Sequence, residues 1–147
     1  MANNGNSNSI SVIGAATNSV IATIPIGGVS GAGPAGLALN PAGTVLYATK
    51  LAGNIVAVID IATRAVTHTI AVGSLPEAIA MSPNGARVYV ANLGSNNVSV
   101  IETATNTVTA TIPVGSSPTG VDVDRTGALV YVANNGSNNV SVIDAAS

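Results

Sequence analysis

The sequence predicts an all-β fold assembled from one repeated unit. Three tyrosines, Tyr47, Tyr89 and Tyr131, are each 42 residues apart, and segment 88–101 recurs almost letter for letter as segment 130–143. Hydrophobic residues make up 47% of the chain and are mainly Val, Ile, Ala and Leu, which suit a pleated, half-buried surface. Apolar and polar residues alternate with period two, which is typical of strands, and no segment shows the period of a helix. The chain is therefore expected to be a β-rich repeat protein.

Each repeat contains four short segments with strand character. In the unit that follows Pro76 they are residues 77–81, 87–91, 97–102 and 107–112. Asn84-Gly85, between the first two, is a strong signal for a tight hairpin turn. Four antiparallel strands in about 42 residues is the pattern of a β-propeller blade. A parallel β-helix is the alternative, but it usually has a shorter coil and would not need this hairpin.

The repeats divide the chain, residues 1–147, into a single array of about three blades. The segments are a partial blade at 1–27, blades at 34–73 and 76–115, and an incomplete blade at 118–147. Thirteen strands are expected, because the first segment supplies only the third and fourth strands of its blade and the last segment lacks its fourth. Propellers usually have four to eight blades, so three are too few to close. Two apolar blade faces would be left in water, which predicts association.

Closure by a second copy is the arrangement we expect. In a homodimer, strand 19–24 of each chain would complete the blade that ends at Asp144 of the other, which gives a ring of six blades. The interface would then include Val20, Ile24, Val140 and Val142. An open fibre built from the same contact and a fragment of a longer propeller are the alternatives.

Composition excludes several classes of function. The chain has only four Lys and Arg residues, which are scattered, and a net charge of -2, so a nucleic-acid partner is not expected. No apolar run approaches the ~18 residues of a membrane helix, so membrane insertion is not expected either. Cysteine is absent, which excludes disulfides, thiolate metal sites and covalent haem attachment. The first nine residues are not a secretory signal, so an extracellular or cell-surface location is expected only within a longer secreted protein.

Candidate ligand-binding residues occupy the variable position after each recurring proline, where the first strand of a blade starts. They are Ala35, Glu77 and Thr119. The first strand of a blade lines the central channel of a propeller, so these side chains and the long loop 28–33 are expected at the channel mouth. Their location, rather than their chemistry, makes them candidates.

Asp122 and Asp124 form the chain's only closely spaced carboxylate pair, and period two places both on one face of a first strand. Oxygen ligands of this kind suit a hard cation such as Ca²⁺, which is the one cofactor considered. In the alternative interpretation Asp122 binds nearby backbone groups and Asp124 shapes the following turn. No catalytic set is indicated, since His68 is the only histidine and lies on a predicted outermost strand.

The repeated motifs resemble a known family. Segments 82–92 and 95–115, which contain Val-Tyr-Val-Ala-Asn and Ser-Asn-Asn-Val-Ser-Val-Ile, closely resemble the YVTN β-propeller repeat of surface-layer and cell-surface proteins. The resemblance covers essentially the whole chain. It implies a propeller fold and a non-enzymatic structural or binding role, with a cell-surface protein or carbohydrate as a further partner. Two alternatives stay open: a lectin-like oligomer whose asparagine loops bind sugar hydroxyls, and an accessory propeller of a redox enzyme.

Overall fold

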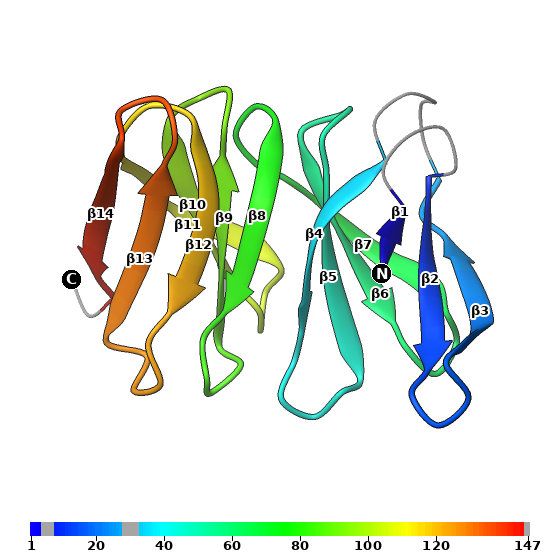
Figure 1. Ribbon diagram of the computed structural model, residues 1–147. Coiled ribbons are helices and arrows are strands. Elements are labelled where there is room, and N and C mark those ends of the chain that lie inside the picture. The colour runs from blue at the N-terminus through cyan, green and yellow to red at the C-terminus, as the bar shows by residue number, and fades with distance from the viewer. Residues whose placement is uncertain (4–7, 28–32, 146–147) are drawn as a thin grey trace.

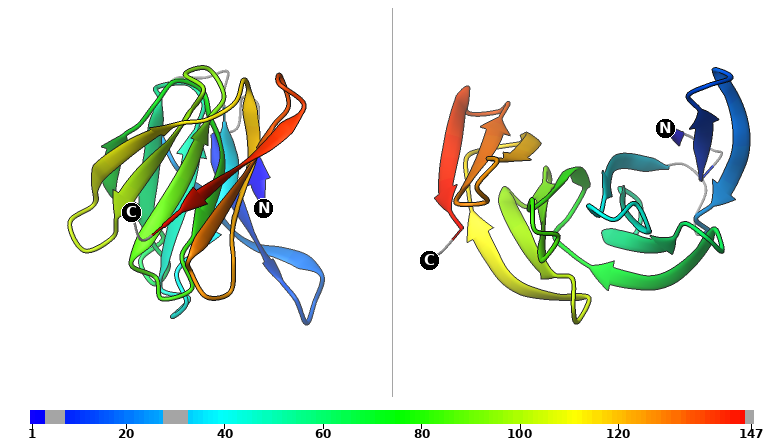
Figure 2. Two further views of the ribbon diagram at one scale, coloured as in Figure 1. Left: turned by 90° about the vertical axis from the view of Figure 1, so that its left-hand side faces the viewer. Right: turned by 90° about the horizontal axis from the view of Figure 1, so that it is seen from below.

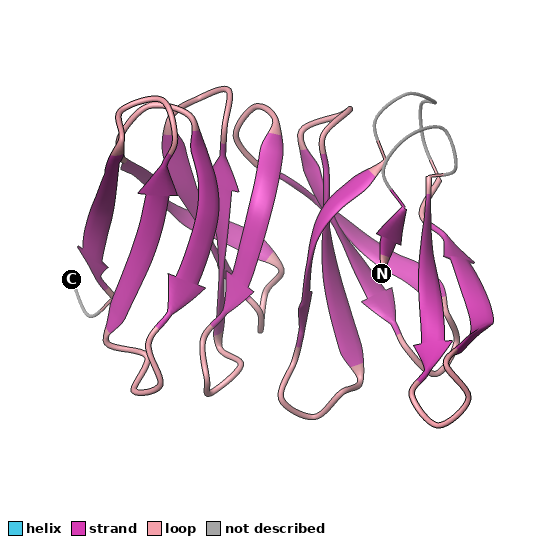
Figure 3. Ribbon diagram, in the orientation of Figure 1, coloured by secondary structure: helices cyan, strands magenta, loops and turns pink. Residues whose placement is uncertain are grey.

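The computed structural model describes residues 1–3, 8–27 and 33–145, and its regular elements are all strands (Figure 3). Four antiparallel sheets stand side by side in an open arc (Figures 1 and 2). The predicted all-β fold with four-stranded antiparallel blades is thereby confirmed, and a parallel β-helix is excluded. In the described part of the chain, no helix is long and apolar enough to cross a membrane.

Two complete blades occupy the middle of the arc. The first full blade consists of β4 (Pro34–Leu39), β5 (Val45–Lys50), β6 (Ile55–Asp60) and β7 (Ala65–Ala71). The second full blade consists of β8 (Pro76–Met81), β9 (Arg87–Asn92), β10 (Asn97–Glu102) and β11 (Thr107–Pro113). In each blade the strands pair with their neighbours in chain order, as expected of hairpin-linked strands.

Three-stranded sheets form the two ends of the arc. The N-terminal sheet contains β1 (Ala2–Asn3), β2 (Ser9–Gly14) and β3 (Ser19–Pro25), and the C-terminal sheet contains β12 (Pro118–Val123), β13 (Leu129–Asn134) and β14 (Asn139–Asp144). The described residues thus form fourteen strands where thirteen were predicted. The additional one is β1, in which Ala2 pairs with Ile10, because these residues correspond to the end of a second strand.

The turn between the first and second strands of a blade is held by one side chain at its start. In the first full blade the Asn40 Oδ1 accepts hydrogen bonds from the backbone N–H of Thr44 at 2.8 Å and of Val45 at 3.0 Å. Ser82 takes this place in the second full blade, where its Oγ accepts from the Arg87 N–H at 2.9 Å. Gly43 closes the first of these turns with a φ of 71°, which glycine adopts without strain.

The turn between the second and third strands connects neighbouring blades. Asn54 and Asn96 both adopt a positive φ of 54° there, a conformation that asparagine tolerates. The Asn54 Oδ1 accepts a hydrogen bond from the backbone N–H of Leu75 at 3.0 Å, and the Asn96 Oδ1 accepts one from Ser117 at 2.8 Å. In both cases the donor lies at the start of the next blade, so these asparagines fasten one blade to the following one.

The hydrophobic core lies between successive sheets. At the two joints that follow a full blade, a tyrosine of the second strand and two valines of the third strand form one side, and branched residues of the next sheet form the other. At the joint between the two full blades these are Tyr47, Val56 and Val58 against Val88, Val90 and Ile101. At the following joint they are Tyr89, Val98 and Val100 against Val130 and Val132.

Candidate functional site

The C-terminal sheet exposes the side that, in every other sheet, is packed against the following sheet. This surface, the C-terminal face, consists of Leu129, Tyr131, Val140 and Val142. Tyr131 and Val142 are directly paired across β13 and β14, so the face is continuous. Exposed fractions are 42% for Tyr131, 60% for Val140 and 58% for Val142. Contiguous exposed apolar surface of this kind is typical of interaction sites, which makes the C-terminal face a candidate.

The N-terminal sheet exposes the opposite side of a blade. Its surface, the N-terminal face, consists of Ile13 and Val20, whose exposed fractions are 49% and 59%. Ile13 and Val20 are paired across β2 and β3. In the second full blade the corresponding Ile101 is buried and Val108 packs against the joint. The N-terminal face therefore presents side chains of the type that cover a neighbouring blade.

The prediction that Ile24 lies at an oligomer interface is corrected by its burial. Ile24 is 1% exposed and packs in the chain's own core with Ile10 and Leu46. A β-bulge causes this difference from Val20, since the β2–β3 register shifts between Val12 and Ile13 and leaves Ile21 as an extra residue. The side chains before and after the bulge face opposite sides of the sheet. Val20, Val140 and Val142 are exposed, as an interface position requires.

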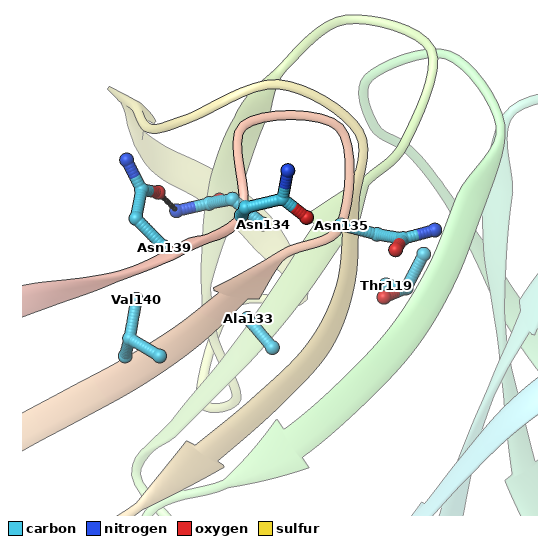
Figure 4. A pocket seen from close by; sticks show the side chains of 7 residues that line it. Thr119, Ala133, Asn134, Asn135, Asn139 and Val140 are labelled. Atoms are coloured by element: carbon cyan, nitrogen blue, oxygen red, sulfur yellow. Dashed lines mark hydrogen bonds between the residues drawn. The ribbon is translucent and has the colours of Figure 1, made fainter.

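An amide-rich hollow of about 320 Å³ opens beside the C-terminal face (Figure 4). It is lined by Thr119, Ala133, Asn134, Asn135, Asn138, Asn139 and Val140. The Asn134 Nδ2 donates hydrogen bonds to the Asn139 Oδ1 and the Ser141 Oγ, both at 2.9 Å, so much of this amide cluster holds the turn together. Asn138 has the positive φ, 53°, of the blade-fastening asparagines, and among the described residues nothing donates to its side chain.

The three predicted channel-mouth residues lie on the neighbouring first strands β4, β8 and β12 (Figure 1). Ala35, Glu77 and Thr119 are all half-buried. Thr119 lines the amide-rich hollow, whereas the backbone carbonyl of Glu77 accepts a hydrogen bond from the Thr49 Oγ1 at 3.0 Å. Residues 28–32 of the predicted long loop lie outside the described residues. The structure therefore places only Thr119 in a hollow, and ligand binding by this trio stays a prediction.

Asp122 and Asp124 are both engaged with neighbouring groups. The Asp122 Oδ1 accepts from the backbone N–H of Val123 at 2.9 Å. Asp124 occupies the turn position of Asn40, and its Oδ1 accepts from the Leu129 N–H at 3.0 Å while its Oδ2 accepts from Thr126 Oγ1. These bonds, that of Leu129 first, lower the pKa of the Asp124 carboxyl. Within the described ranges no three His, Cys, Asp or Glu residues cluster as metal ligands, so the structure gives Asp124 a turn-forming role.

Comparison with known proteins identifies the family. The family described as "Lactonase, 7-bladed beta-propeller" matches residues 14–111 and 79–147. This chain belongs to that family. No curated protein matches the sequence.

Among solved structures, this propeller is similar to hydrazine synthase of Kuenenia stuttgartiensis, with 27% identity and a TM-score of 0.85 over 95% of this chain and 40% of that one. It also shares its fold with a functionally unknown protein from Desulfotomaculum acetoxidans, with 24% identity and a TM-score of 0.74 over 92% of this chain and 48% of that one. The chain therefore spans less than half the length of both structures.

His68 and Lys50 are two polar residues in opposite environments, one exposed and one buried. His68 is exposed on β7, the outermost strand of the first full blade. Lys50 is 2% exposed and its Nζ donates a hydrogen bond to the backbone carbonyl of Gly27. It occupies the place of the buried Asn92 and Asn134. Sequence reasoning did not select Lys50, although its replacement of the repeat's asparagine is visible when the repeats are aligned.

Proposed function

We propose that this chain is a non-catalytic propeller module with a structural or binding role, and that it associates with copies of itself through its two terminal sheets. The observation that carries this proposal is the contrast between Tyr131, Val140 and Val142, which are exposed, and the buried Tyr89, Val98 and Val100 at the same places in the second full blade. Exposed apolar faces favour association, because each Å² of apolar surface removed from water contributes about 25 cal/mol to the free energy of binding.

The placement of the ionisable side chains supports a non-catalytic role. His68 lies on an outermost strand, away from the first strands that line the concave side (Figure 2). Asp60 and Asp124 hold turns through hydrogen bonds to Thr63 and Thr126. Because the family is described as lactonase, hydrolysis of simple lactones is the activity to assay. We expect rates equal to those in buffer, and turnover that depends on enzyme concentration would contradict the non-catalytic role.

A cell-surface setting forms part of the proposal. It is supported by the resemblance of segments 82–92 and 95–115 to the repeat of surface-layer proteins. Surface layers are built by repeated contacts between copies, which matches a module with two complementary apolar faces. Fractionation of the source cells with an antibody to this chain would test it, and a signal confined to the cytoplasmic fraction would contradict it.

Absolute mass in solution tests self-association directly. Light scattering on a sizing column, over a tenfold range of protein concentration, should give twice the chain mass of 14.2 kDa or a larger multiple. A monomer at every concentration would contradict the proposal. A series of molecular masses that increases with protein concentration would support the open, fibre-like form of association over a closed one.

Carbohydrate binding is a second candidate function. The amide-rich hollow favours it, because amide side chains both donate to and accept from sugar hydroxyls. Glycan-array binding that is lost in Asn135→Ala and Asn138→Ala, but kept in Asn106→Ala on the opposite turns, would support this function. An array without signal would exclude it for the glycans displayed.

A further inference from the structure

We infer that two copies close into a ring through two identical joints, in each of which the C-terminal face of one copy packs on the N-terminal face of the other. This inference rests on the proposed self-association and specifies its contact. It predicts a heterologous joint, in which different surfaces meet, repeated twice by a two-fold axis. It differs from the exchange of β3 that the sequence suggests, because here each chain keeps all its own strands.

The joint between the two full blades supplies the template for this contact. There the side of the sheet that carries Tyr47, Val56 and Val58 is covered by the following sheet. The joint between the second full blade and the C-terminal sheet repeats the arrangement, with Tyr89 and Val100 covered by Val130, Val132 and their neighbours. The chain thus shows twice what covers a face of this composition: the opposite side of another blade.

The C-terminal face repeats the covered side of this template. Tyr131, Val140 and Val142 correspond to Tyr89, Val98 and Val100 in the sequence repeat. The corresponding pairs also have the same register, since Tyr131 faces Val142 just as Tyr89 faces Val100. A blade that fits the second full blade should therefore also fit the C-terminal sheet.

The N-terminal face repeats part of the covering side. Ile13 corresponds to Ile101, which is fully buried in the template joint, and Val20 corresponds to Val108, which packs against the same cluster. Both are exposed in this chain. A second copy thus supplies the part of the covering side that Ile101 and Val108 form, whereas the described N-terminal sheet has no counterpart of Ile79 or Val88.

Exchange of β3 between copies would disrupt a formed core. Ile24 of β3 pairs with Ile10 of β2, and the two side chains are 1% and 2% exposed. Both belong to the cluster that contains Leu46 and Ile59 of the first full blade. Face-to-face packing leaves this cluster intact and covers only side chains that are exposed.

The shape of the chain agrees with a ring of two copies. The N-terminal and C-terminal sheets lie at opposite ends of an arc whose concave side carries the first strands (Figure 2). Four sheets per chain give eight in a pair, which is within the usual range of propeller blades and one more than the seven of the matched family.

Two variants with opposite charges test the joint. Val142→Lys alters only the C-terminal face, and Val20→Glu alters only the N-terminal face. Both side chains are more than half exposed, so each variant should fold, which circular dichroism can check. Each variant alone places a charge against an apolar residue in both joints, and we expect its dissociation constant to rise at least tenfold. A 1:1 mixture has one native joint and one Lys–Glu joint, and we expect it to recover the wild-type mass.

The controls separate this inference from the proposed function. Leu39→Glu adds a charge at an exposed apolar residue outside both faces and should associate like the wild type. A wild-type chain that is monomeric would overturn both the proposed function and the ring. A wild type that associates, while Val20→Glu associates equally well or the mixture fails to recover, would overturn the ring alone.

Discussion

The second full blade and the C-terminal sheet are nearly the same sequence in two environments. Segment 88–101 is buried from both sides, whereas one side of segment 130–143 faces water. Val98 is 0% exposed and its counterpart Val140 is 60% exposed, although each pairs with the corresponding alanine of the preceding strand, Ala91 or Ala133. Unlike β14, β10 also pairs with a fourth strand. The repeat therefore determines how a blade folds, and the neighbouring blade determines whether its face becomes core or surface.

The side-chain hydrogen bonds of the turns also depend on whether another blade follows. The Asn96 side chain accepts a hydrogen bond from Ser117 of the next sheet, while the equivalent Asn138 lines an open hollow. The backbone conformation is unchanged, with a φ of 54° at Asn96 and 53° at Asn138. The turn is thus formed locally, and the fastening bond depends on a following blade.

The largest expected difference between the two regions is the loss of stability when a valine of the apolar face is replaced by a charged residue. Val98→Asp would bury an unpaired carboxylate in the closed joint and should lower the free energy of unfolding by about 4 kcal/mol or more, enough to prevent folding. Val140→Asp, on the open face, should change the unfolding free energy of the monomer by less than about 0.5 kcal/mol. Urea titration at low protein concentration measures both. Equal losses would show that the two faces are equally buried in solution.

Completing the C-terminal sheet should make it more like the second full blade. We would append Asn-Thr-Val-Thr-Ala-Thr-Ile-Pro-Val, the sequence of 106–114, after Ser147. The added strand should pair with β14, and its first valine, the copy of Val108, should enter the cavity of about 90 Å³ lined by Val100, Ile112 and Ile143. Hydrogen bonds of about 1 kcal/mol each, reduced by the entropy of ordering, predict a gain of about 2 kcal/mol.

A matched extension keeps this experiment interpretable. The same nine residues with aspartate in place of the first valine should give little or no gain, because the side chain that enters the cavity is then charged. Chemical denaturation compares the two extended chains with the original. An equal gain from both extensions would contradict pairing with β14.

A smaller difference in the free energy of unfolding is expected between variants of the buried Tyr47 and the exposed Tyr131. The buried Tyr47 phenol donates a hydrogen bond to the Asn106 Oδ1 at 3.2 Å, so Tyr47→Phe should cost about 1 kcal/mol, whereas Tyr131→Phe on the open face should cost almost nothing. Burial raises the pKa of the Tyr47 hydroxyl. The corresponding stability is present below the unfolded pKa of about 10 and is lost as pH rises above it. Tyr47→Phe should therefore flatten the fall in stability seen in alkaline urea titrations.

The smallest effect concerns the turns that start with Asn40, Ser82 and Asp124. The pKa of Asp124 is lowered by hydrogen bonds from Leu129 and Thr126, so its stabilising effect is present above the unfolded pKa of about 4 and is lost as pH falls below that value. Asp124→Asn copies the residue of the first full blade and should retain the turn at neutral pH. Melting temperatures between pH 2.5 and pH 6 should then depend less on pH than in the wild type. An unchanged acid dependence would indicate that other carboxyl groups, such as Asp60, dominate it.

The sequence by itself determined the blades and their turns. Alternation with period two, the Tyr spacing of 42 residues and the Asn84-Gly85 turn are local signals, and local hydrogen bonds and φ preferences satisfy them within each hairpin. The strands predicted for the second full blade accordingly agree with the observed ones to within one residue at each end. The strand at Ala2–Asn3 was missed because two residues give too short a pattern to recognise.

Only the tertiary structure decided which identical side chains are buried and which are exposed. A bulge of one residue at Ile21 separated Val20 from Ile24, and no periodicity rule places such a bulge without knowledge of the pairing. The amide-rich hollow and the two open faces likewise depend on whether another blade is present beside a sheet. Burial is a property of the contacts between blades, which are long-range, whereas the repeat encodes contacts within a blade, which are short-range.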